Sequence, residues 1–442
     1  MRALKIAYKS PTQLQSRERN PRIHTRRQIK QIAASIKEFG FVSPVLTDSS
    51  NTIIAGHGRV AAAKLLGMPD IPTVCVDHLT PSQIRAYLVA DNRLAELAGW
   101  DRKLLALELQ ELSIQPNFDV SITGFETAEI DILIDELNEP IPDDSDELPD
   151  IDRTRPSISL PGDLWQIGNH RLLCGNALDH EGYEQLLGKT KAQLVFTDPP
   201  YNLSISRTLR ANSRKRREFA MASGEMTGDE YRSFLGRTFA NLCAASADGS
   251  IHFVCIDWRH VRELLNAAEE HYAELKNVCV WAKGNAGMGS LYRSQHELVC
   301  VFKNGTAPHV NNVELGRFGR SRSNVWRYAG GTSFGNSRDS QLDHPTVKPL
   351  PLVADAIMDC SARGDVVLDA FVGSGTTLIA AERTGRIGYG IELDAHYVDA
   401  TLSRFNDAYG LKAVHLQSNK SFEEIARNRL KEIDHGRQIE GR

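Results

Sequence analysis

The segment from Asp365 to Leu378 constrains the fold of this chain more than any other stretch. It reads Asp-Val-Val-Leu-Asp-Ala-Phe-Val-Gly-Ser-Gly-Thr-Thr-Leu, so an apolar run leads into a glycine-rich turn. A second strand pattern, residues 386–392, ends at Glu392, which stands 19 positions after Gly373. This order predicts a strand, a turn, a helix and a second strand, the unit from which α/β sheets are built. The glycines let a ligand approach the backbone, and an acid at this spacing accepts hydrogen bonds from ribose hydroxyls.

A second motif, Asp-Pro-Pro-Tyr at residues 198–201, follows the apolar run 194–197. That run predicts a buried parallel strand, and ligands of open α/β sheets bind at the carboxyl ends of such strands. Asp198 can accept one hydrogen of an amino group on a flat ring and the Pro199 carbonyl the other, while Tyr201 stacks on the ring. The alternative is a proline turn capped by an aspartate, which needs no ligand.

Together these motifs resemble those of DNA amino methyltransferases, which methylate adenine N6 or cytosine N4. A third segment, His-Pro-Thr-Val-Lys-Pro at residues 344–349, resembles the part of that family that covers the methionine end of S-adenosylmethionine. Asp198 precedes Gly373 by 175 residues, which resembles the β arrangement of the family, and the resemblance spans about residues 160–408. It implies a Rossmann-like S-adenosylmethionine-dependent methyltransferase sheet of the α/β class. Aspartate, rather than serine, before the two prolines favours adenine N6 over cytosine N4.

The resemblance also implies a role for each motif residue. The catalytic residues are expected to be Asp198, Pro199, Pro200 and Tyr201. The residues expected to hold the cofactor are Asp369, Phe371, Gly373, Gly375, Thr376, Glu392, Lys348 and Asn176. Glu392 would hold the ribose and Lys348 would pair with the cofactor carboxylate. Asn176 stands where the family carries an aspartate, so it adds a hydrogen bond but no charge. No metal is expected.

Two basic stretches are candidates for DNA contact. The first follows the Asp-Pro-Pro-Tyr motif and includes Arg207, Arg210, Arg214, Lys215, Arg216 and Arg217. Its position next to the motif favours a loop that grips phosphates over a merely solvated surface. The second, residues 284–341, occupies the place of the family's target-recognition region. It combines arginines with aromatic residues, namely Arg293, Arg317, Arg320, Arg322, Arg327 and Arg338 with Tyr292, Trp326 and Tyr328. Such a mixture suits groove contact and stacking.

The N-terminal part carries a different set of signals. Thr25-x-x-Gln28 starts an amphipathic helix, residues 42–55 form a hairpin pattern, and Gly56-His57-Gly58-Arg59 opens a second helix. With Asn20-Pro21-Arg22, these signals resemble the N-terminal domain of ParB-like proteins, over about residues 5–80. Arg59 could hold an anion at the glycine turn. The family usually has Gly-Glu-Arg-Arg here, so His57 and Gly58 are departures that speak against nucleotide hydrolysis and nuclease activity.

Length and composition set the domain plan. A chain of 442 residues predicts two or three domains. Residues 139–152 hold seven acids and no base, so a net charge of −4 less these acids leaves +3 for the remainder. The expected parts are a small α+β ParB-like domain (1–80), a helical extension (81–138), an acidic proline-rich linker (139–160), a methyltransferase domain (161–410) with a target-recognition region (284–341), and a tail (411–442). Seven scattered cysteines and the lack of an apolar run of about 18 residues favour a cytoplasmic protein and no membrane.

Several alternatives stay open at this point. The expected partner is double-stranded DNA, but methylation of cytosine N4, of RNA or of a protein amide would use the same tetrapeptide. In another reading the ParB-like part is the functional module, binding DNA or a nucleotide, and the methylase half supports it. A homodimer, the recognition sequence and the presence of a partner restriction enzyme are equally undecided.

Overall fold

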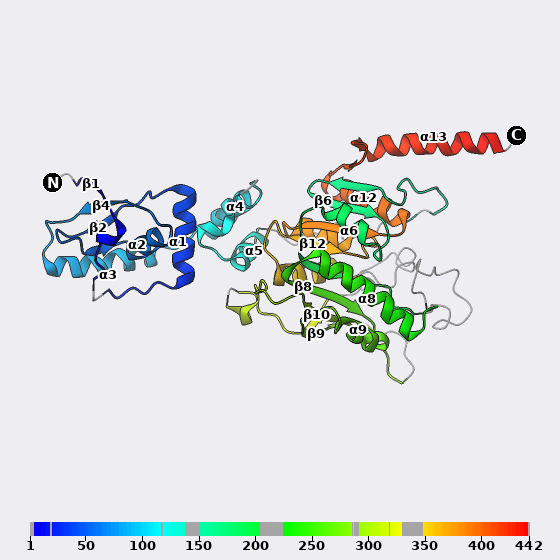
Figure 1. Ribbon diagram of the computed structural model, residues 1–442, viewed down its shortest axis with the longest axis horizontal. Helices are drawn as coiled ribbons and strands as arrows, with labels where there is room; N and C mark the ends of the chain where they lie inside the picture. The colour runs from blue at the N-terminus through cyan, green and yellow to red at the C-terminus, as the bar shows by residue number, and fades with distance from the viewer. Residues whose placement is uncertain are drawn as a thin grey trace. The chain divides into compact units, whose positions relative to one another are not determined.

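The protein consists of two compact units, Met1–Leu137 and Asn138–Arg442. The computed structural model describes residues 4–17, 20–115, 118–137, 151, 153–203, 224–284, 286, 291–317, 319–328 and 348–440, with side chains to residue 431 at the C-terminal end. Figure 1 shows the elements of each unit, and the two units are described separately.

The first unit contains a four-stranded sheet in the order β1-β4-β2-β3. Its strands and helices are β1 (Ile6–Lys9), η1 (Pro11–Gln13), α1 (Arg26–Phe39), β2 (Val45–Thr47), β3 (Ile53–Ala55), α2 (His57–Leu65), β4 (Ile71–Cys75), α3 (Pro81–Leu97), α4 (Arg102–Ser113), η2 (Val120–Thr123) and α5 (Thr127–Asp135). The predicted helix start at Thr25 is confirmed, because the Thr25 hydroxyl accepts from the Gln28 N–H at 3.2 Å. Thr80 with Gln83 forms a full capping box at the start of α3. The predicted hairpin is the antiparallel pair β2 and β3.

The second unit is built on one eleven-stranded sheet in the order β11-β9-β10-β8-β7-β12-β13-β6-β5-β14-β15. The strands are β5 (Leu164–Ile167), β6 (His170–Cys174), β7 (Ala192–Thr197), β8 (Ser246–Ile256), β9 (Glu274–Ala282), β10 (His296–Lys303), β11 (Val325–Arg327), β12 (Val366–Asp369), β13 (Ile387–Glu392), β14 (Ala413–His415) and β15 (Lys420–Ser421). The central strands β6, β13, β12, β7 and β8 run parallel.

The helices of this unit place a topological switch point between β7 and β12. They are α6 (His180–Leu187), α8 (Gly228–Ala245), η4 (Trp258–His260), α9 (Val261–Ala268), η5 (Glu314–Gly316), α10 (Leu350–Cys360), α11 (Thr376–Arg383), α12 (Ala395–Tyr409) and α13 (Phe422–Glu440). From β7 the chain crosses through α8 to β8, whereas from β12 it crosses through α11 to β13, in the opposite direction along the sheet. Right-handed crossovers therefore put α8 and α11 on opposite faces, and ligands of such sheets bind in the crevice between the two strands.

The two predicted motifs meet at this point because their strands are neighbours. Leu194 pairs with Val367, and Val195 with Leu368, in parallel register. Leu194, Val195 and Leu368 are fully buried. Burying such a side chain contributes about 1.5–3 kcal/mol each, which fixes the two strands side by side. Adjacent strands lie about 4.8 Å apart. Asp198 and the glycine turn, which follow these two strands, therefore leave the sheet side by side.

Some sequence expectations fall outside the described residues. These are the basic stretch with Arg207, Arg210, Arg214, Lys215, Arg216 and Arg217, the linker residues 139–150, Arg338 and residues 344–347 of the third motif. The sheet itself extends beyond residue 410, since β14 pairs with β5 and β15 pairs with β14. Within the described chain, no helix combines the length and the apolar character needed to cross a membrane.

The arginines of the expected target-recognition region do not share one environment. Arg320 and Arg322 are engaged with Asp355 and Asp359 of α10, at distances of 2.7 Å between Arg320 Nη2 and Asp359 Oδ1 and 2.7 Å between Arg322 Nη1 and Asp355 Oδ2. Trp326 is buried beneath Arg322, whose guanidinium carbon lies 5.4 Å from the indole centroid. Arg320 and Arg322 therefore fasten this segment to α10 and Trp326 packs beneath Arg322, so these three side chains are engaged within the protein rather than presented on an open surface as expected.

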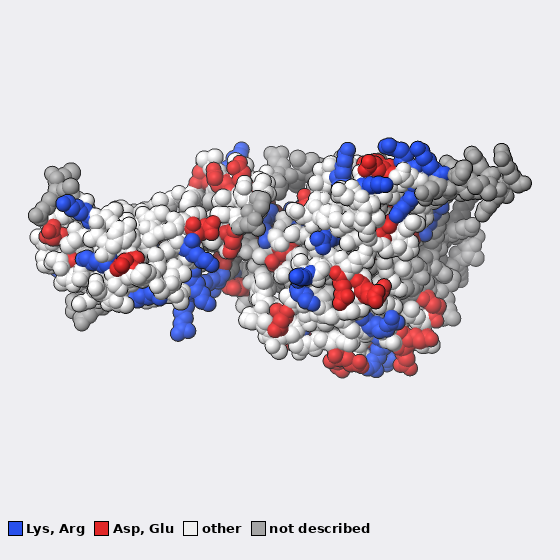
Figure 2. All heavy atoms as spheres, turned by 45° about the horizontal axis from the view of Figure 1, so that its top comes forward, with Lys and Arg blue, Asp and Glu red and all other residues white. Residues whose placement is uncertain are grey.

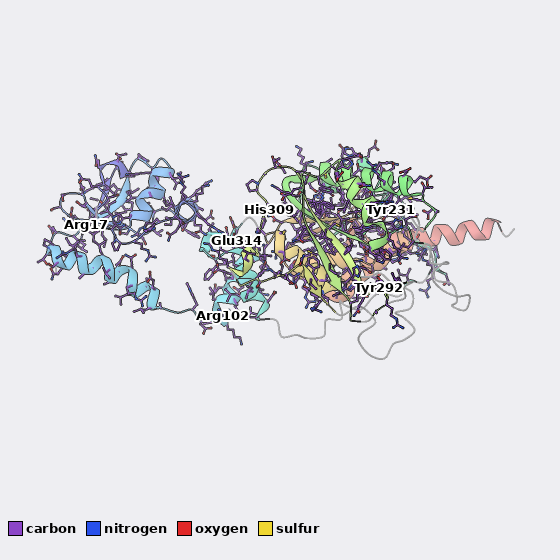
Figure 3. All side chains as sticks on the ribbon, turned by 90° about the horizontal axis from the view of Figure 1, so that it is seen from below. Arg17, Arg102, Tyr231, Tyr292, His309 and Glu314 are labelled. Atoms are coloured by element: carbon purple, nitrogen blue, oxygen red, sulfur yellow. The ribbon has the colours of Figure 1, made fainter. Side chains whose placement is uncertain are left out.

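Other residues of the same region are on the surface. The side chains of Arg293, Arg317 and Arg327 are exposed, and Tyr292 is 83% exposed. Tyr292 projects from the unit, whereas Tyr231 lies inside its packed body (Figure 3). In the view of Figure 2, both basic and acidic side chains lie on the surface of this unit. For the exposed arginines, contact with DNA stays a prediction.

Candidate active site

The Asp-Pro-Pro-Tyr segment forms a turn that is held from three sides. The Tyr201 hydroxyl donates to Asp198 Oδ1 at 2.5 Å, and the Tyr231 hydroxyl of α8 donates to the Pro200 carbonyl at 2.9 Å. Asn202 adopts a left-handed conformation with φ of 53°. Its side-chain amide donates to the Met226 carbonyl at 2.8 Å, and its side-chain oxygen accepts from the Met226 N–H at 3.2 Å. The turn is thus fixed by hydrogen bonds as well as by the two prolines.

Asp198 stands in a group of alternating charges. Lys348 Nζ lies 2.6 Å from Asp198 Oδ2, 2.9 Å from the Tyr201 hydroxyl and 3.0 Å from Glu297 Oε2. Glu297 in turn accepts from Lys283 Nζ at 2.5 Å. The Lys348 and Glu297 side chains are 4% and 8% exposed, while those of Asp198 and Lys283 are 24% and 27% exposed. Two carboxylates are therefore balanced by two ammonium groups at this edge of the sheet.

Burial and the neighbouring charges shift the pKa values of this group in different directions. Burial raises the pKa of Asp198, Lys348 opposes the rise and Glu297 adds to it. Burial alone would lower the pKa of Lys348, but the carboxylates of Asp198 and Glu297 raise it above its ordinary value. Burial would also raise the pKa of Glu297, but Lys348 and Lys283 hold it below its usual value. Both lysines therefore favour ionised carboxylates.

Glu297 and Lys283 did not emerge from the sequence motifs. Glu297 belongs to β10, and Lys283 follows β9 directly. The strands pair antiparallel, with Glu297 opposite Trp281, so both side chains reach the edge where β7 ends. The sequence feature that could have indicated Glu297 is an acid at the start of the apolar run Leu-Val-Cys-Val-Phe. A buried strand rarely carries an unpaired charge, so such an acid indicates a cationic partner.

The glycine turn after β12 provides an open space beside a fixed acid. At Gly373, with φ of 55°, a side chain would meet no atom within 4 Å, whereas at Gly375, with φ of 90°, a Cβ would lie 2.7 Å from Thr401 Cγ2. Glu392 faces the turn, since its Oε2 accepts from the Gly373 N–H and its Oε1 from the Asp394 N–H, both at 2.8 Å. Burial raises the pKa of Glu392 to about 7. The carboxylate is thus oriented by backbone donors beside an open backbone surface.

Asp369 is used within the protein. Its carboxylate accepts from the Thr377 hydroxyl at 2.7 Å, from the Thr197 hydroxyl at 2.9 Å and from the Phe371 N–H at 2.9 Å. It is 2% exposed, and burial raises its pKa to about 6. Because Thr197 ends β7, this carboxylate ties the Asp198 strand to the glycine turn. Its predicted approach to the methionine part of a cofactor stays a prediction.

The other predicted cofactor residues lie near this edge with varied surroundings. Phe371 is half-buried, 6.0 Å from the Phe234 ring by centroids. Thr376 is buried at the start of α11, where its hydroxyl contacts Arg404. The Asn176 side chain accepts from the Leu178 N–H at 3.0 Å. Lys348 contacts Asp198 and Glu297, so its predicted pairing with a cofactor carboxylate also stays a prediction.

A separate cavity of about 190 Å³ lies in the first unit, around the Gly-His-Gly-Arg turn. Arg59 reaches over Gly56, and burial lowers its pKa while Asp91 opposes the shift. The His57 Nε2 atom is buried and has no hydrogen-bond partner among the described residues. Gly58 packs against α1, because a Cβ there would lie 2.9 Å from Ile32 Cδ1. Close packing of α1 on α2 therefore accounts for glycine at this position.

Family models match three parts of the chain. The model described as DNA methylase, of N6 and N4 type, matches residues 192–403, which hold both motifs and the strands that join them. The chain therefore contains a DNA methylase domain of the N6/N4 type. The ParB N-terminal domain matches residues 4–92 of this methylase, and the ParB-methyltransferase HTH domain matches residues 103–161. The two resemblances and the fold expected from the sequence are therefore confirmed.

Individual proteins match the two parts of the methylase separately. The ParB-like nuclease domain-containing protein YnaK of Escherichia coli strain K12 is 44% identical over 80 residues, which cover 18% of this chain and 92% of that protein. The type II methyltransferase M.HpaI of Haemophilus parainfluenzae is 22% identical over 255 residues, 54% of this chain and 76% of that protein. The solved PvuII DNA methyltransferase, titled cytosine-N4-specific, is 18% identical, covers 59% of this chain and 91% of its own, and gives a TM-score of 0.43.

S-adenosylmethionine is the methyl donor of this family, and the residues of the glycine turn fit such a group. The space in front of Gly373 admits a ligand against the backbone, and Glu392 is an oriented acceptor for a pair of ribose hydroxyls. Both features lie at the switch point where ligands of open α/β sheets bind.

Proposed function

We propose that this methylase transfers a methyl group from S-adenosylmethionine to the exocyclic N6 amino group of adenine in DNA. The observation that carries the proposal is the Asp198 carboxylate, held by Tyr201 and Lys348 at the end of β7, beside the glycine turn of β12. The carboxylate that would bind the target amino group thus lies next to the turn that would bind the ribose of the methyl donor. Such proximity and orientation supply a large part of the rate of a transfer between two bound groups.

In this proposal Asp198 and Pro199 orient the amino group. Asp198 accepts one amino hydrogen and the Pro199 carbonyl the other, which points the nitrogen lone pair at the methyl group. Bound S-adenosylmethionine supplies a methyl group made electrophilic by its positively charged sulfur. As the nitrogen is alkylated it must lose a proton, and Asp198 is the carboxylate placed to accept it. Tyr201 is proposed to stack on the ring, and Pro200 keeps the turn rigid.

The remaining site residues are proposed to bind the cofactor. Glu392 accepts from the ribose hydroxyls, and Gly373 and Gly375 shape the turn that admits the methionine part. Phe371 lines the cofactor, with Asp369, Thr376 and Asn176 in supporting positions, whereas Lys348 faces Asp198 and Glu297. The base must leave the stack to reach Asp198, at a cost of a few kcal/mol that stacking and hydrogen bonds offset. Arg214, Lys215, Arg216 and Arg217 are proposed to hold the DNA phosphates.

Analysis of the product identifies the base. Unmethylated genomic DNA treated with the protein and S-adenosylmethionine is digested to nucleosides and examined by mass spectrometry. We expect N6-methyladenine, because aspartate precedes the two prolines. N4-methylcytosine in its place would move the proposal to the alternative base, and methylation of RNA or of protein amides in competition would move it to another substrate class.

The cofactor site carries a pH prediction. Burial raises the pKa of Glu392 to about 7, so the free carboxyl takes up a proton as the pH falls through 7. The protonated form loses an acceptor for ribose hydroxyls, and cofactor affinity should fall about tenfold between pH 8 and pH 6 if the ionised form binds. Calorimetric titration with S-adenosylmethionine at each pH measures this. The Glu392→Gln variant should bind weakly with a flat profile, and an unchanged slope in that variant would contradict the assignment.

We further propose that Arg59 contacts an anionic group at the cavity of the first unit, either a DNA phosphate or a nucleotide. The cavity and the unpaired His57 nitrogen favour this second role. Titration of the full chain with nucleoside triphosphates and with DNA, beside Arg59→Ala, separates the two ligands. Unchanged affinity for both in the variant would exclude the role.

A further inference from the structure

We infer that Glu297 and Lys283 are positioning residues for methyl transfer, which hold Lys348 against Asp198 and so keep the amino-group acceptor in place. The inference rests on the proposed function and deepens it, because neither residue belongs to a motif. Glu297 acts through Lys348, and Lys283 acts through Glu297. Neither residue contacts Asp198 directly in the described chain.

The geometry orders these groups from the solvent to the reacting edge. Lys283 is 27% exposed, Glu297 is 8% exposed and Lys348 is 4% exposed. Three acceptors surround the Lys348 ammonium, which has three N–H bonds: Asp198 Oδ2, the Tyr201 hydroxyl and Glu297 Oε2. The Tyr201 hydroxyl accepts from Lys348 and donates to Asp198 Oδ1. Asp198 is thus gripped at both oxygens by groups that Glu297 helps to align.

The topology gives each group a different strand. β7 leads to Asp198, β10 begins beside Glu297 and β9 ends before Lys283. The pairing of β10 with both β8 and β9 brings these ends to one edge. Lys348, which stands just before α10, contacts Asp198 on one side. Glu297 provides a second negative charge on the other side of its ammonium group.

The charge balance explains why four groups are needed. One ammonium between two buried carboxylates would leave a net negative charge, and like charges at close range favour uptake of a proton. Lys283 supplies the second positive charge. Glu297 then remains ionised without drawing Lys348 away from Asp198. Lys283 is the most exposed of the four charged side chains, so its ammonium group has the smallest cost of desolvation.

Other groups also face Asp198 and must be considered in its titration. They are Tyr201 on the same turn, Cys255 on β8, Tyr231 on α8 and Asp369 on β12, in addition to Lys348, Glu297 and Lys283. Burial raises the pKa of Tyr201, Tyr231 and Cys255, so these three stay neutral near pH 7. Asp369 is held by three hydrogen-bond donors of its own. The charged neighbours that a substitution can change without breaking the turn are therefore Glu297 and Lys283.

The test compares the rate of methyl transfer to unmethylated genomic DNA across pH for Glu297→Gln and Lys283→Met. Glu297→Gln removes a negative neighbour, so the acid limb should move to lower pH by about one unit while the plateau rate falls. Lys283→Met should move the limb the other way, since Glu297 then competes harder for Lys348. The KM for S-adenosylmethionine should stay the same in both variants. A merely structural role would not produce opposite shifts.

Matched controls come from an exposed ion pair on β9, the strand that ends directly before Lys283. Glu274 and Lys276 lie at the start of β9, with 3.0 Å between Lys276 Nζ and Glu274 Oε1. Glu274→Gln and Lys276→Met should leave the pH profile at that of the wild type. A Glu297→Asp variant keeps the charge, so it should recover part of the rate lost in Glu297→Gln.

A second measurement needs neither DNA nor activity. Denaturant unfolding of wild type, Glu297→Gln, Lys348→Met and the double variant gives the coupling between Glu297 and Lys348. We expect the two substitutions to be clearly non-additive. Additive effects, or pH profiles that coincide with the wild type, would overturn the inference while leaving the proposed function intact. Failure of the wild type to methylate any DNA would instead remove the proposed function, and the positioning role with it.

Discussion

The Asp198→Asn variant should lose methyl transfer almost completely, while it still folds and binds S-adenosylmethionine. The substitution keeps the shape of the side chain but replaces one acceptor oxygen by a donor, so it can no longer accept from both Tyr201 and the amino group. It also takes the Asp198 carboxylate away from Lys348, which keeps its contacts with Glu297 and the Tyr201 hydroxyl. General-base contributions are typically 10²–10⁴-fold, and we expect a rate loss of about that size.

Single-turnover transfer from radiolabelled S-adenosylmethionine measures this loss, with cofactor affinity measured by calorimetry. Asp229→Asn is the matched control, because Asp229 is an exposed aspartate in the first turn of α8. A rate within a few fold of the wild type in Asp198→Asn would contradict the role of this carboxylate. Loss of cofactor binding in the same variant would show that the substitution disturbs the glycine turn instead.

The Asp359→Ala variant should destabilise the methylase unit by about 3–5 kcal/mol, because it leaves two buried guanidinium groups with too little negative charge. Asp359 accepts from Arg320 Nη2 at 2.7 Å and from Arg322 Nε at 3.0 Å, and its side chain is 8% exposed. Asp355 is more exposed and also binds the Tyr328 hydroxyl, so it cannot take over both contacts.

Denaturant unfolding followed by tryptophan fluorescence measures this change, since four of the five tryptophans, all except Trp100, belong to the second unit. Glu314→Ala is the control. It removes a partly exposed partner of the exposed Arg317, and a surface pair of this kind is worth at most about 1 kcal/mol. A loss in Asp359→Ala no larger than that of the control would show that Arg320 and Arg322 are not structural.

The parts of the fold that local chemistry determines were predictable. Helix α1 begins directly after the Thr25 cap as expected, and β7 and β12 lead into the two motifs. A buried parallel strand, a glycine turn and a capping box each depend on a few neighbouring residues, so the sequence displays them directly.

The charges around Asp198 depend on contacts far apart in the chain. Glu297 lies 96 residues from Tyr201, and only the pairing of β10 with β8 and β9 brings it to the site. Arg320 and Arg322 had the composition of a DNA-binding surface, yet their partners Asp355 and Asp359 sit in the apolar helix α10. Two acids one turn apart in a buried helix were the signal that pointed to buried cations.

In the proposed reaction one edge of the sheet holds both the amino group and the methyl donor, and Asp198 accepts a hydrogen of the amino group. Transfer of a trideuterated methyl group from labelled S-adenosylmethionine to DNA can be followed by mass spectrometry of the nucleosides. We expect N6-(trideuteromethyl)adenine with the wild type and none with Asp198→Asn, although both bind the cofactor. A wild-type protein that binds S-adenosylmethionine but labels no base, or an Asp198→Asn variant that labels DNA as well as the wild type, would contradict the proposed reaction.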